Sequence, residues 1–325
     1  MIRLSYLRTI LAVCFMQAVV SMANSAEIVL SFDDAPQPDG WALTGPERTE
    51  RFISVLNEKA APPVVFYANP RGPMDESLSR LRSYGEAGHF IANHTHDHSD
   101  LNAVTGEEFI QSISSAEDQL TSVPNFRKWF RYPYLSEGQT AESKAKAVKA
   151  YLQQNGYRSG YVTVETFDWH IDDRVRGEVE KGNPVDEEQW KRFHVSMILE
   201  LVDFNDDLAN ELLGRSPVHV VLLHENDINA LSLPMLIDGL RERGHTLVSA
   251  EKAFADPIAD TKWDQHRFSQ RRLMAIAVED QYRGQVGSKW IDTDYIDQRL
   301  TESGLLCQDA YFFCSFSSWL CEKLC

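Results

Sequence analysis

The chain has 325 residues, of which 43% are hydrophobic and 25% are charged, and its formal net charge is −16. This length is enough for one large α/β domain with a smaller appendage. A chain this acidic has no basic stripe to bind phosphates, which excludes a nucleic-acid partner. Its negative charge is also repelled by anionic lipid, which disfavours docking on a membrane surface.

Residues 1–25 are predicted to be a signal peptide. Arg3 and Arg8 precede an apolar run, and small residues surround a cleavage site near Ser25. The apolar run is too short for a convincing transmembrane helix. Cleavage would change the net charge from −16 to −18, because two Arg and no acids are lost. We therefore expect a secreted or periplasmic protein with no stable membrane anchor; a lipoprotein modified at Cys14 and an uncleaved anchor are the lesser alternatives.

From residue 27 onward, short apolar runs typical of buried strands alternate with segments of helical periodicity. In the first half, strands are predicted at 27–32, 64–67 and 89–93, and helices at 46–59, at 76–86 and after the capping box of Thr105 and Glu108. In the second half, helices are predicted at 141–154, 187–213 and 234–243, and strands at 161–164, 218–223 and 246–248. This alternation indicates a mostly parallel sheet covered by helices, open or closed into a barrel, with its chemistry at the carboxyl ends of the strands.

The regular alternation ends near Pro257. We expect a main domain at 26–257 and a mostly helical C-terminal extension at 258–325 that packs on it. Four cysteines lie within the last twenty residues: Cys307, Cys314, Cys321 and Cys325. An even number of cysteines in an exported chain permits disulfides, and burial without pairing is an equal alternative. Their spacing does not favour a zinc site.

Four polar groups follow predicted strands and should therefore lie at one end of the sheet. They are Asp33-Asp34, His94 to His98, Arg131 to Tyr134, and His224. Each group alone has an ordinary structural explanation, such as a solvated turn, a salt bridge or a packed imidazole. Their common placement is what indicates a functional site.

Amide or ester hydrolysis at neutral pH needs an activated water, and a metal with three protein ligands supplies one. His94 and His98 are four residues apart, so one tight turn directs both at a single ion. One of two adjacent acids completes a set of two His and one carboxylate, and the other acid remains available as a base. His96 and Asp97 are expected to be structural or to lie behind the ligands.

The chain resembles the polysaccharide deacetylases of carbohydrate esterase family 4, which contain the NodB homology domain. Five segments are similar to the five motifs of the family, in the family's order: Ser31-Phe32-Asp33-Asp34, Asn93-His94-Thr95-x-x-His98, Arg131-x-Pro133-Tyr134, Phe167-Asp168-Trp169 and Leu222-Leu223-His224. The resemblance covers roughly residues 27–250. It implies a distorted (β/α) barrel with a shallow groove for sugar chains.

The resemblance also implies a metal centre and a base. Asp34, His94 and His98 would hold one divalent ion, with Zn²⁺ preferred over cobalt and other ions that accept such ligands. Asp33 would be the general base, and Arg131 would orient it and keep it ionised.

The remaining implied roles concern the acetyl group and the leaving group. The backbone N–H of Tyr134 would stabilise the oxyanion together with the metal. Trp169 would line the acetyl pocket. His224 would be the acid that protonates the departing amine, and Asp168 would adjust the acidity of His224.

Three residues depart from the family pattern without removing a ligand, base or acid. Ala35 replaces the usual Gly, so its turn must avoid positive φ or be strained. Glu165 stands for the first Asp of the fourth motif, and Leu135 for a Gly. These changes reshape the groove and weaken any transfer of substrate specificity from the family.

We expect a metal-dependent hydrolase that deacetylates an extracytoplasmic glycan, with N-acetylglucosamine polymers favoured over O-acetylated xylan. The alternatives are a non-catalytic carbohydrate-binding protein and a metal-dependent hydrolase of small amides or phosphoesters. A binding protein has no need of both Asp33 and His224. The chain has no phosphate-binding glycine loop, which counts against phosphoesters.

Overall fold

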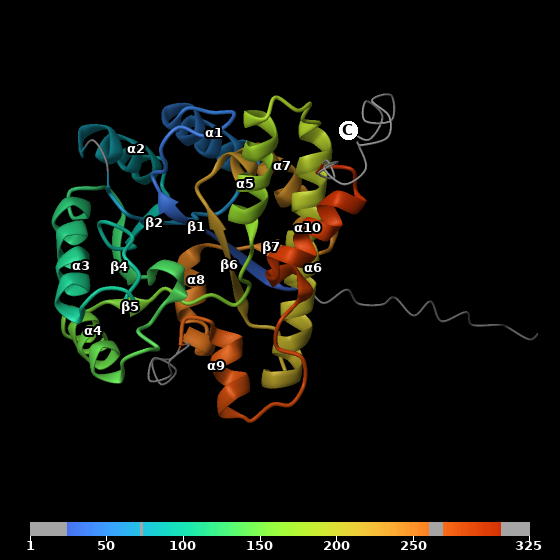
Figure 1. Cartoon of the computed structure of the whole chain (residues 1–325). Helices are drawn as coiled ribbons and strands as arrows, with labels where there is room; N and C mark the ends of the chain where they lie inside the picture. Colours follow the sequence, from blue (N-terminus) through green and yellow to red (C-terminus); the bar gives the residue numbers. More distant parts are fainter. Residues whose placement is uncertain (1–24, 72–73, 260–268, 307–325) are drawn as a thin grey trace, which may run out of the picture.

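The computed structural model describes residues 25–71, 74–259 and 269–306 (Figure 1). The predicted signal peptide, apart from Ser25, and the four C-terminal cysteines lie outside these residues. The centre of the fold is a seven-stranded sheet in the order β5-β4-β3-β2-β1-β6, with β7 paired to β1. The strand bounds are β1 Glu27–Ala35, β2 Val65–Ala68, β3 Phe90–Asn93, β4 Phe126–Phe130, β5 Arg158–Ser159, β6 Val218–His224 and β7 Thr246–Leu247.

Every strand pair is parallel, and β1 is the most enclosed strand. It pairs with β6 along residues 27–33 and with β2 from Ser31 onward. All but two of its nine residues are buried. A strand covered on both faces needs a nearly continuous apolar run, which is the pattern of residues 28–32.

One stretch, residues 158–164, curls the sheet toward closure. Arg158 and Ser159 pair with β4, and Val164 forms a parallel bridge with Val221 of β6. The same short stretch therefore joins one edge of the sheet, at β5 and β4, to the outer strand β6 at the other edge. This curled parallel sheet confirms the predicted distorted (β/α) barrel.

Ten α-helices surround the sheet within the described residues (Figure 1). Their bounds are α1 Gly45–Glu58, α2 Met74–Glu86, α3 Gly106–Leu120, α4 Glu142–Gln154, α5 Asp168–Glu180, α6 Glu187–Leu213, α7 Asp227–Glu242, α8 Ala250–Ala255, α9 Arg272–Glu279 and α10 Thr293–Glu302. The capping box of Thr105 and Glu108 is present at the start of α3, as predicted. None of the described helices combines the length and apolar character that a membrane span requires.

Two sequence predictions in the second half were wrong in detail, and strand β4 and helix α5 were missed. The helix predicted from Pro234 begins at Asp227, because Asn226 caps it and Pro234 is tolerated inside. The strand predicted at 161–164 is reduced to isolated bridges, and the strand lies at 158–159. Helix α5 was not predicted, because its charged sequence shows little helical amphipathicity.

Described residues beyond 257 pack on the main body. In the 3₁₀ turn before α10, Trp290 is buried, and its Nε1 donates to Glu200 of α6 over 2.6 Å. Ile296 and Leu300 of α10 join the core cluster of the main domain. The side chains of this segment therefore share a hydrophobic core with α6.

Candidate active site

The carboxyl ends of β1 and β6 bring two predicted site residues together. Asp33 in β1 and His224 in β6 are register partners in adjacent parallel strands. The backbone N–H of Glu225 donates to the carbonyl oxygen of Asp33 over 3.0 Å. Asp33 is buried, whereas His224 keeps 17% of its side chain exposed. The sheet thus fixes the spacing between a carboxylate and an imidazole.

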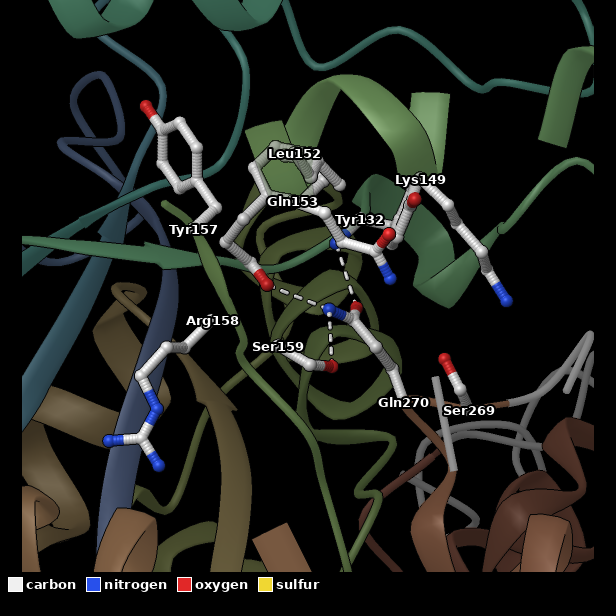
Figure 2. A pocket seen from close by; sticks show the side chains of 10 residues that line it. Tyr132, Lys149, Leu152, Gln153, Tyr157, Arg158, Ser159, Ser269 and Gln270 are labelled. Atoms are coloured by element: carbon white, nitrogen blue, oxygen red, sulfur yellow. Dashed lines mark hydrogen bonds between the residues drawn. The ribbon is translucent and has the colours of Figure 1, made fainter. Parts of the chain in front are cut away.

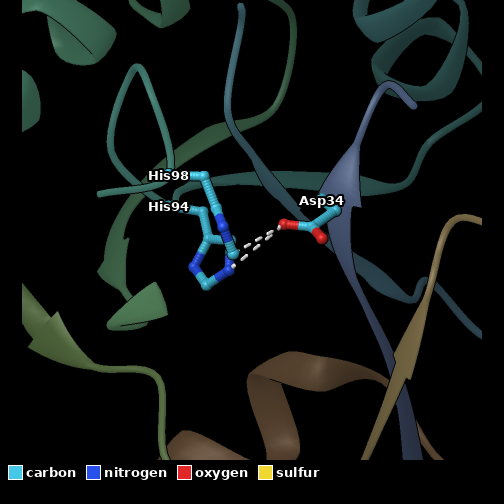
Figure 3. Close-up of side chains that lie close together, drawn as sticks. All are labelled: Asp34, His94 and His98. Carbon is cyan, nitrogen blue, oxygen red and sulfur yellow. Dashed lines mark ion pairs between the residues drawn. The ribbon is translucent and has the colours of Figure 1, made fainter. Parts of the chain in front are cut away.

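Asp34, His94 and His98 form a candidate metal site (Figure 3). Their potential ligand atoms lie within 4.8 Å of one another. The Asp34 carboxylate is 3.0 Å from Nε2 of His98 and 3.7 Å from Nε2 of His94. Ligands of a tetrahedral zinc ion are roughly 3.4 Å apart. The three side chains therefore converge at a spacing that suits one ion.

The protonation states also suit a divalent ion. Nδ1 of His94 lies 2.7 Å from the carbonyl oxygen of Arg131, which can only accept, so the proton is on Nδ1 and the lone pair is on Nε2. Burial lowers the pKa of His94 to about 4. Burial opposes the ionisation of Asp34, but the hydrogen bond and charge of His98 hold the pKa of that carboxyl well below its usual range. A neutral imidazole beside a carboxylate is the donor set that zinc binds.

Local hydrogen bonds hold the histidine loop in an unusual backbone conformation. Thr95 and His98 have φ angles of 67° and 58°. The Asn93 side chain accepts from the backbone N–H of Thr95 over 2.9 Å, and the Thr95 hydroxyl accepts from the backbone N–H of His98 over 3.1 Å. These short polar residues stabilise the turn that directs both histidines toward Asp34.

Two of the three residues between the histidines, His96 and Asp97, lie outside the cluster. Asp97 accepts a hydrogen bond from the Ser112 hydroxyl of α3 over 2.5 Å. Nδ1 of His96 is 3.3 Å from the Gln119 amide of the same helix. Both side chains therefore tie the loop to α3.

Arg131 is fully buried beside Asp33. Its Nη1 lies 2.5 Å from Oδ1 of Asp33, and its Nε donates to the Gly160 carbonyl over 2.8 Å. The guanidinium also lies 3.9 Å above the centre of the Tyr67 ring. These contacts fix the cation, which compensates the buried charge of Asp33.

Asp168, at the start of α5, holds His224. Its Oδ1 is 2.9 Å from Nδ1 of His224, and its Oδ2 accepts from the backbone N–H of His224 over 2.7 Å. Asn229 donates to the same Oδ2 over 2.5 Å. Burial alone would lower the pKa of His224, but the charge and hydrogen bond of Asp168, with Asp34 and Asp33, raise it to about 10.

Asp33, Asp34, the two histidines and His224 open into a cavity of about 480 Å³. Tyr134 and Trp169 also line it and are 63% and 40% exposed. The Tyr134 ring meets the His98 ring edge-on, with centroids 4.5 Å apart. Exposed aromatic rings beside polar groups are typical of small-molecule pockets.

The residues that depart from the family pattern are accommodated in different ways. Ala35 avoids positive φ because the left-handed turn falls one residue earlier, at Asp34, with φ 65°. Leu135 does adopt a positive φ of 50°, a conformation that costs about 1–3 kcal/mol. Packing of its buried side chain against Val162 and Leu222 offsets this cost.

Two site residues were missed by sequence reasoning. Asn69 donates to Oδ1 of Asp34 over 2.8 Å. Its signal was its position two residues after the strand predicted at 64–67, at the same sheet edge as Asp34. Asn229 supports Asp168, but nothing in the sequence distinguishes it from other residues of α7.

Comparisons with known proteins bear on this geometry. A family model described as polysaccharide deacetylase matches residues 22–158, which include Asp33, Asp34, His94, His98 and Arg131. Over residues 22–158 the chain is similar to the polysaccharide deacetylase family. The predicted family resemblance is thereby confirmed.

Two curated relatives illustrate the similarity. The chitooligosaccharide deacetylase of Azorhizobium caulinodans is 32% identical over 120 residues, which are 36% of this chain and 52% of that protein. The probable peptidoglycan-N-acetylglucosamine deacetylase of Arthroderma benhamiae is 27% identical over 126 residues, 38% of this chain and 26% of that protein. The matched part spans about half or less of the length of these relatives.

A family 4 carbohydrate esterase from Streptomyces lividans, solved in complex with acetate, aligns over 71% of this chain and 96% of that chain, with 17% identity and a TM-score of 0.48. Asp168, Trp169 and His224 lie beyond the residues matched by the deacetylase model. The structure itself places Trp169 and His224 in the pocket and the buried Asp168 beside His224.

Proposed function

We propose that this protein is a hydrolase that removes acetyl groups from an extracytoplasmic glycan, with N-acetylglucosamine-type polymers as the preferred substrate. The observation that carries the proposal is the register pairing of Asp33 with His224 beside the Asp34, His94 and His98 cluster. A base and an acid on adjacent strands suit the two proton transfers of amide hydrolysis.

Asp34, His94 and His98 would hold one divalent ion, for which we propose Zn²⁺. When bound, such an ion lowers the pKa of water and polarises a carbonyl group. The chain's own groups then perform the proton transfers and stabilise the developing charge.

Asp33 takes a proton from the water whose oxygen attacks the acetyl carbonyl carbon. Arg131 holds the Asp33 carboxylate in place throughout, because its Nε and Nη2 donate to the backbone carbonyls of Gly160 and Tyr161. The backbone N–H of Tyr134 donates to the oxygen that becomes negative in this step. Trp169 packs beside the acetyl methyl group.

His224 completes the reaction as the acid. Because the pKa of His224 is raised to about 10, the imidazole is cationic at neutral pH. It gives its proton to the sugar nitrogen as the carbon–nitrogen bond breaks, which yields a free amine and acetic acid, and the acid keeps the second proton of the water. Asp33 has gained one proton and His224 has lost one, so the proton count balances and both groups are restored by exchange with solvent.

The proposed site of action is outside the cytoplasm, in the periplasm or the secreted fraction. A net charge of −16 is compatible with a product that carries amino groups. We propose no nucleic-acid partner for so acidic a chain.

The test is acetate release from chitin oligosaccharides, peptidoglycan and acetylated xylan, with and without a chelator. We expect release from the N-acetylated substrates that the chelator abolishes, and loss of release in Asp33→Asn. Release only from xylan would favour an esterase. Glycan binding without release would favour a carbohydrate-binding protein, and release that persists in Asp33→Asn would refute the mechanism.

A further inference from the structure

A short segment from beyond the main domain enters the active-site pocket. Residues 269–272 run beside Val162, whose backbone N–H donates to Gln270 and whose carbonyl accepts from Arg272. The Gln270 amide accepts from the backbone N–H of Tyr132 over 2.8 Å and donates to the Phe130 carbonyl over 2.7 Å (Figure 2). The backbone on both sides of Arg271 is therefore anchored to the barrel.

Arg271 forms a two-point pair with Glu165. Its Nε and Nη2 lie 2.8 and 2.9 Å from the two carboxylate oxygens, and its Nη1 donates to the Leu135 carbonyl over 3.4 Å. Both side chains line the same cavity as Asp33 and His224. Arg271 keeps 26% and Glu165 keeps 23% of the side chain exposed. The glutamate at this place in the fourth motif thus has a partner outside the residues that resemble the family.

The pair retains hydrogen-bonding capacity toward the pocket. Of the five N–H groups of an arginine, three have acceptors for Arg271 among the described residues, which leaves two for a ligand. Each Glu165 oxygen accepts one bond from Arg271 and has a further lone pair. The two charges cancel, so the pair has little attraction for a charged ligand. A neutral hydroxyl group can accept a hydrogen bond from Arg271 and donate one to Glu165, so it matches the hydrogen-bonding capacity of this pair.

We propose that the Arg271–Glu165 pair is a specificity-determining element that hydrogen-bonds hydroxyl groups of the sugar carrying the acetyl group. This inference rests on the proposed deacetylase function. It predicts that the pair contributes to binding of sugar substrates and not to the chemistry at the acetyl group.

The test compares Arg271→Met/Glu165→Gln, which removes the pair without leaving an unpaired charge, with wild type. The matched control is Arg174→Met/Asp297→Asn, which removes another two-point pair between the main domain and the C-terminal segment, outside the pocket. Each variant is assayed on chitotetraose and on 4-nitrophenyl acetate, which has no sugar, and its Tm is measured.

We expect the pocket variant to raise KM for chitotetraose about tenfold or more, with kcat within threefold and the 4-nitrophenyl acetate kinetics unchanged, as for loss of one or two hydrogen bonds. The control should leave both substrates unaffected. An unchanged KM, or equal losses on both substrates, would overturn the inference.

Failure of the proposed function is distinguishable from failure of this inference. If wild type releases no acetate from any glycan, the deacetylase proposal fails. The binding of chitotetraose, measured by calorimetry, then tests the role of the pair by itself, and we expect the pocket variant to bind the sugar more weakly than wild type. The inference about the pair would be overturned if wild type did not bind the sugar or if both proteins bound it equally.

Discussion

Oδ1 of the buried Asp168 lies 2.9 Å from Nδ1 of His224, so the proposed acid is paired with a fixed negative charge. Burial disfavours the cation, and Asp168 more than compensates, which raises the pKa of His224 to about 10. The cationic form therefore persists from acid pH to well above neutrality and is lost as pH rises through this value.

Replacing Asp168 with Asn should lower the pKa of His224 toward 6.5 and move the alkaline limb of the kcat profile to lower pH. We expect activity at pH 8 to fall by at least tenfold relative to activity at pH 5.5. The exposed Asp173→Asn on the same helix serves as the control. Superimposable profiles of Asp168→Asn and wild type would contradict the assignment.

Arg131→Met should destabilise the fold, because Asp33 would keep a buried charge without its partner. Loss of one member of a buried ion pair costs about 3–5 kcal/mol in the free energy of unfolding. Urea denaturation measures this loss. The double variant with Asp33→Asn should recover part of it, and a double variant no more stable than Arg131→Met would refute this explanation.

Zn²⁺ should raise the Tm of the wild-type protein, since an ion that binds only the folded chain stabilises it by about 2.7 kcal/mol at a concentration of 100 times Kd. His98→Ala should abolish this rise because it removes one of three ligands. His96→Ala, from the same loop but outside the cluster, should retain it. Equal responses of the two variants would place the ion elsewhere.

His89 should make the fold sensitive to acid. Burial lowers the pKa of His89 to about 4, and the unfolded chain has the ordinary value near 6.5. Between these values the unfolded state binds more protons, so stability falls as pH falls, by about 1.4 kcal/mol per pH unit. His89→Asn should reduce the slope of unfolding free energy against pH by up to that amount. An unchanged slope would show that His89 does not titrate in this range.

The first half of the barrel was predictable because its strands are short apolar runs with polar residues at their ends. Asp33 and His94 each directly follow or end such a run, so a parallel sheet had to bring them to one edge. Capping signals such as Thr105 and Glu108 located helix starts for an equally local reason.

Other features depend on contacts between distant residues and leave no local signal. Arg271 reaches Glu165 across 106 positions of sequence. Helix α5 depends on tertiary contacts, because Ile171 and Val175 are buried within an otherwise charged segment. Asn229 acts through Asp168, which is 61 positions away.

The stretch at 158–164 has a consequence for handling the protein. Outer strands of a sheet expose unpaired N–H and C=O groups that recruit other chains. Because this one stretch covers one side of both β4 and β6, its release after a proteolytic cut would expose two such strands at once. Nicked material should therefore self-associate even though almost all of its mass is still folded.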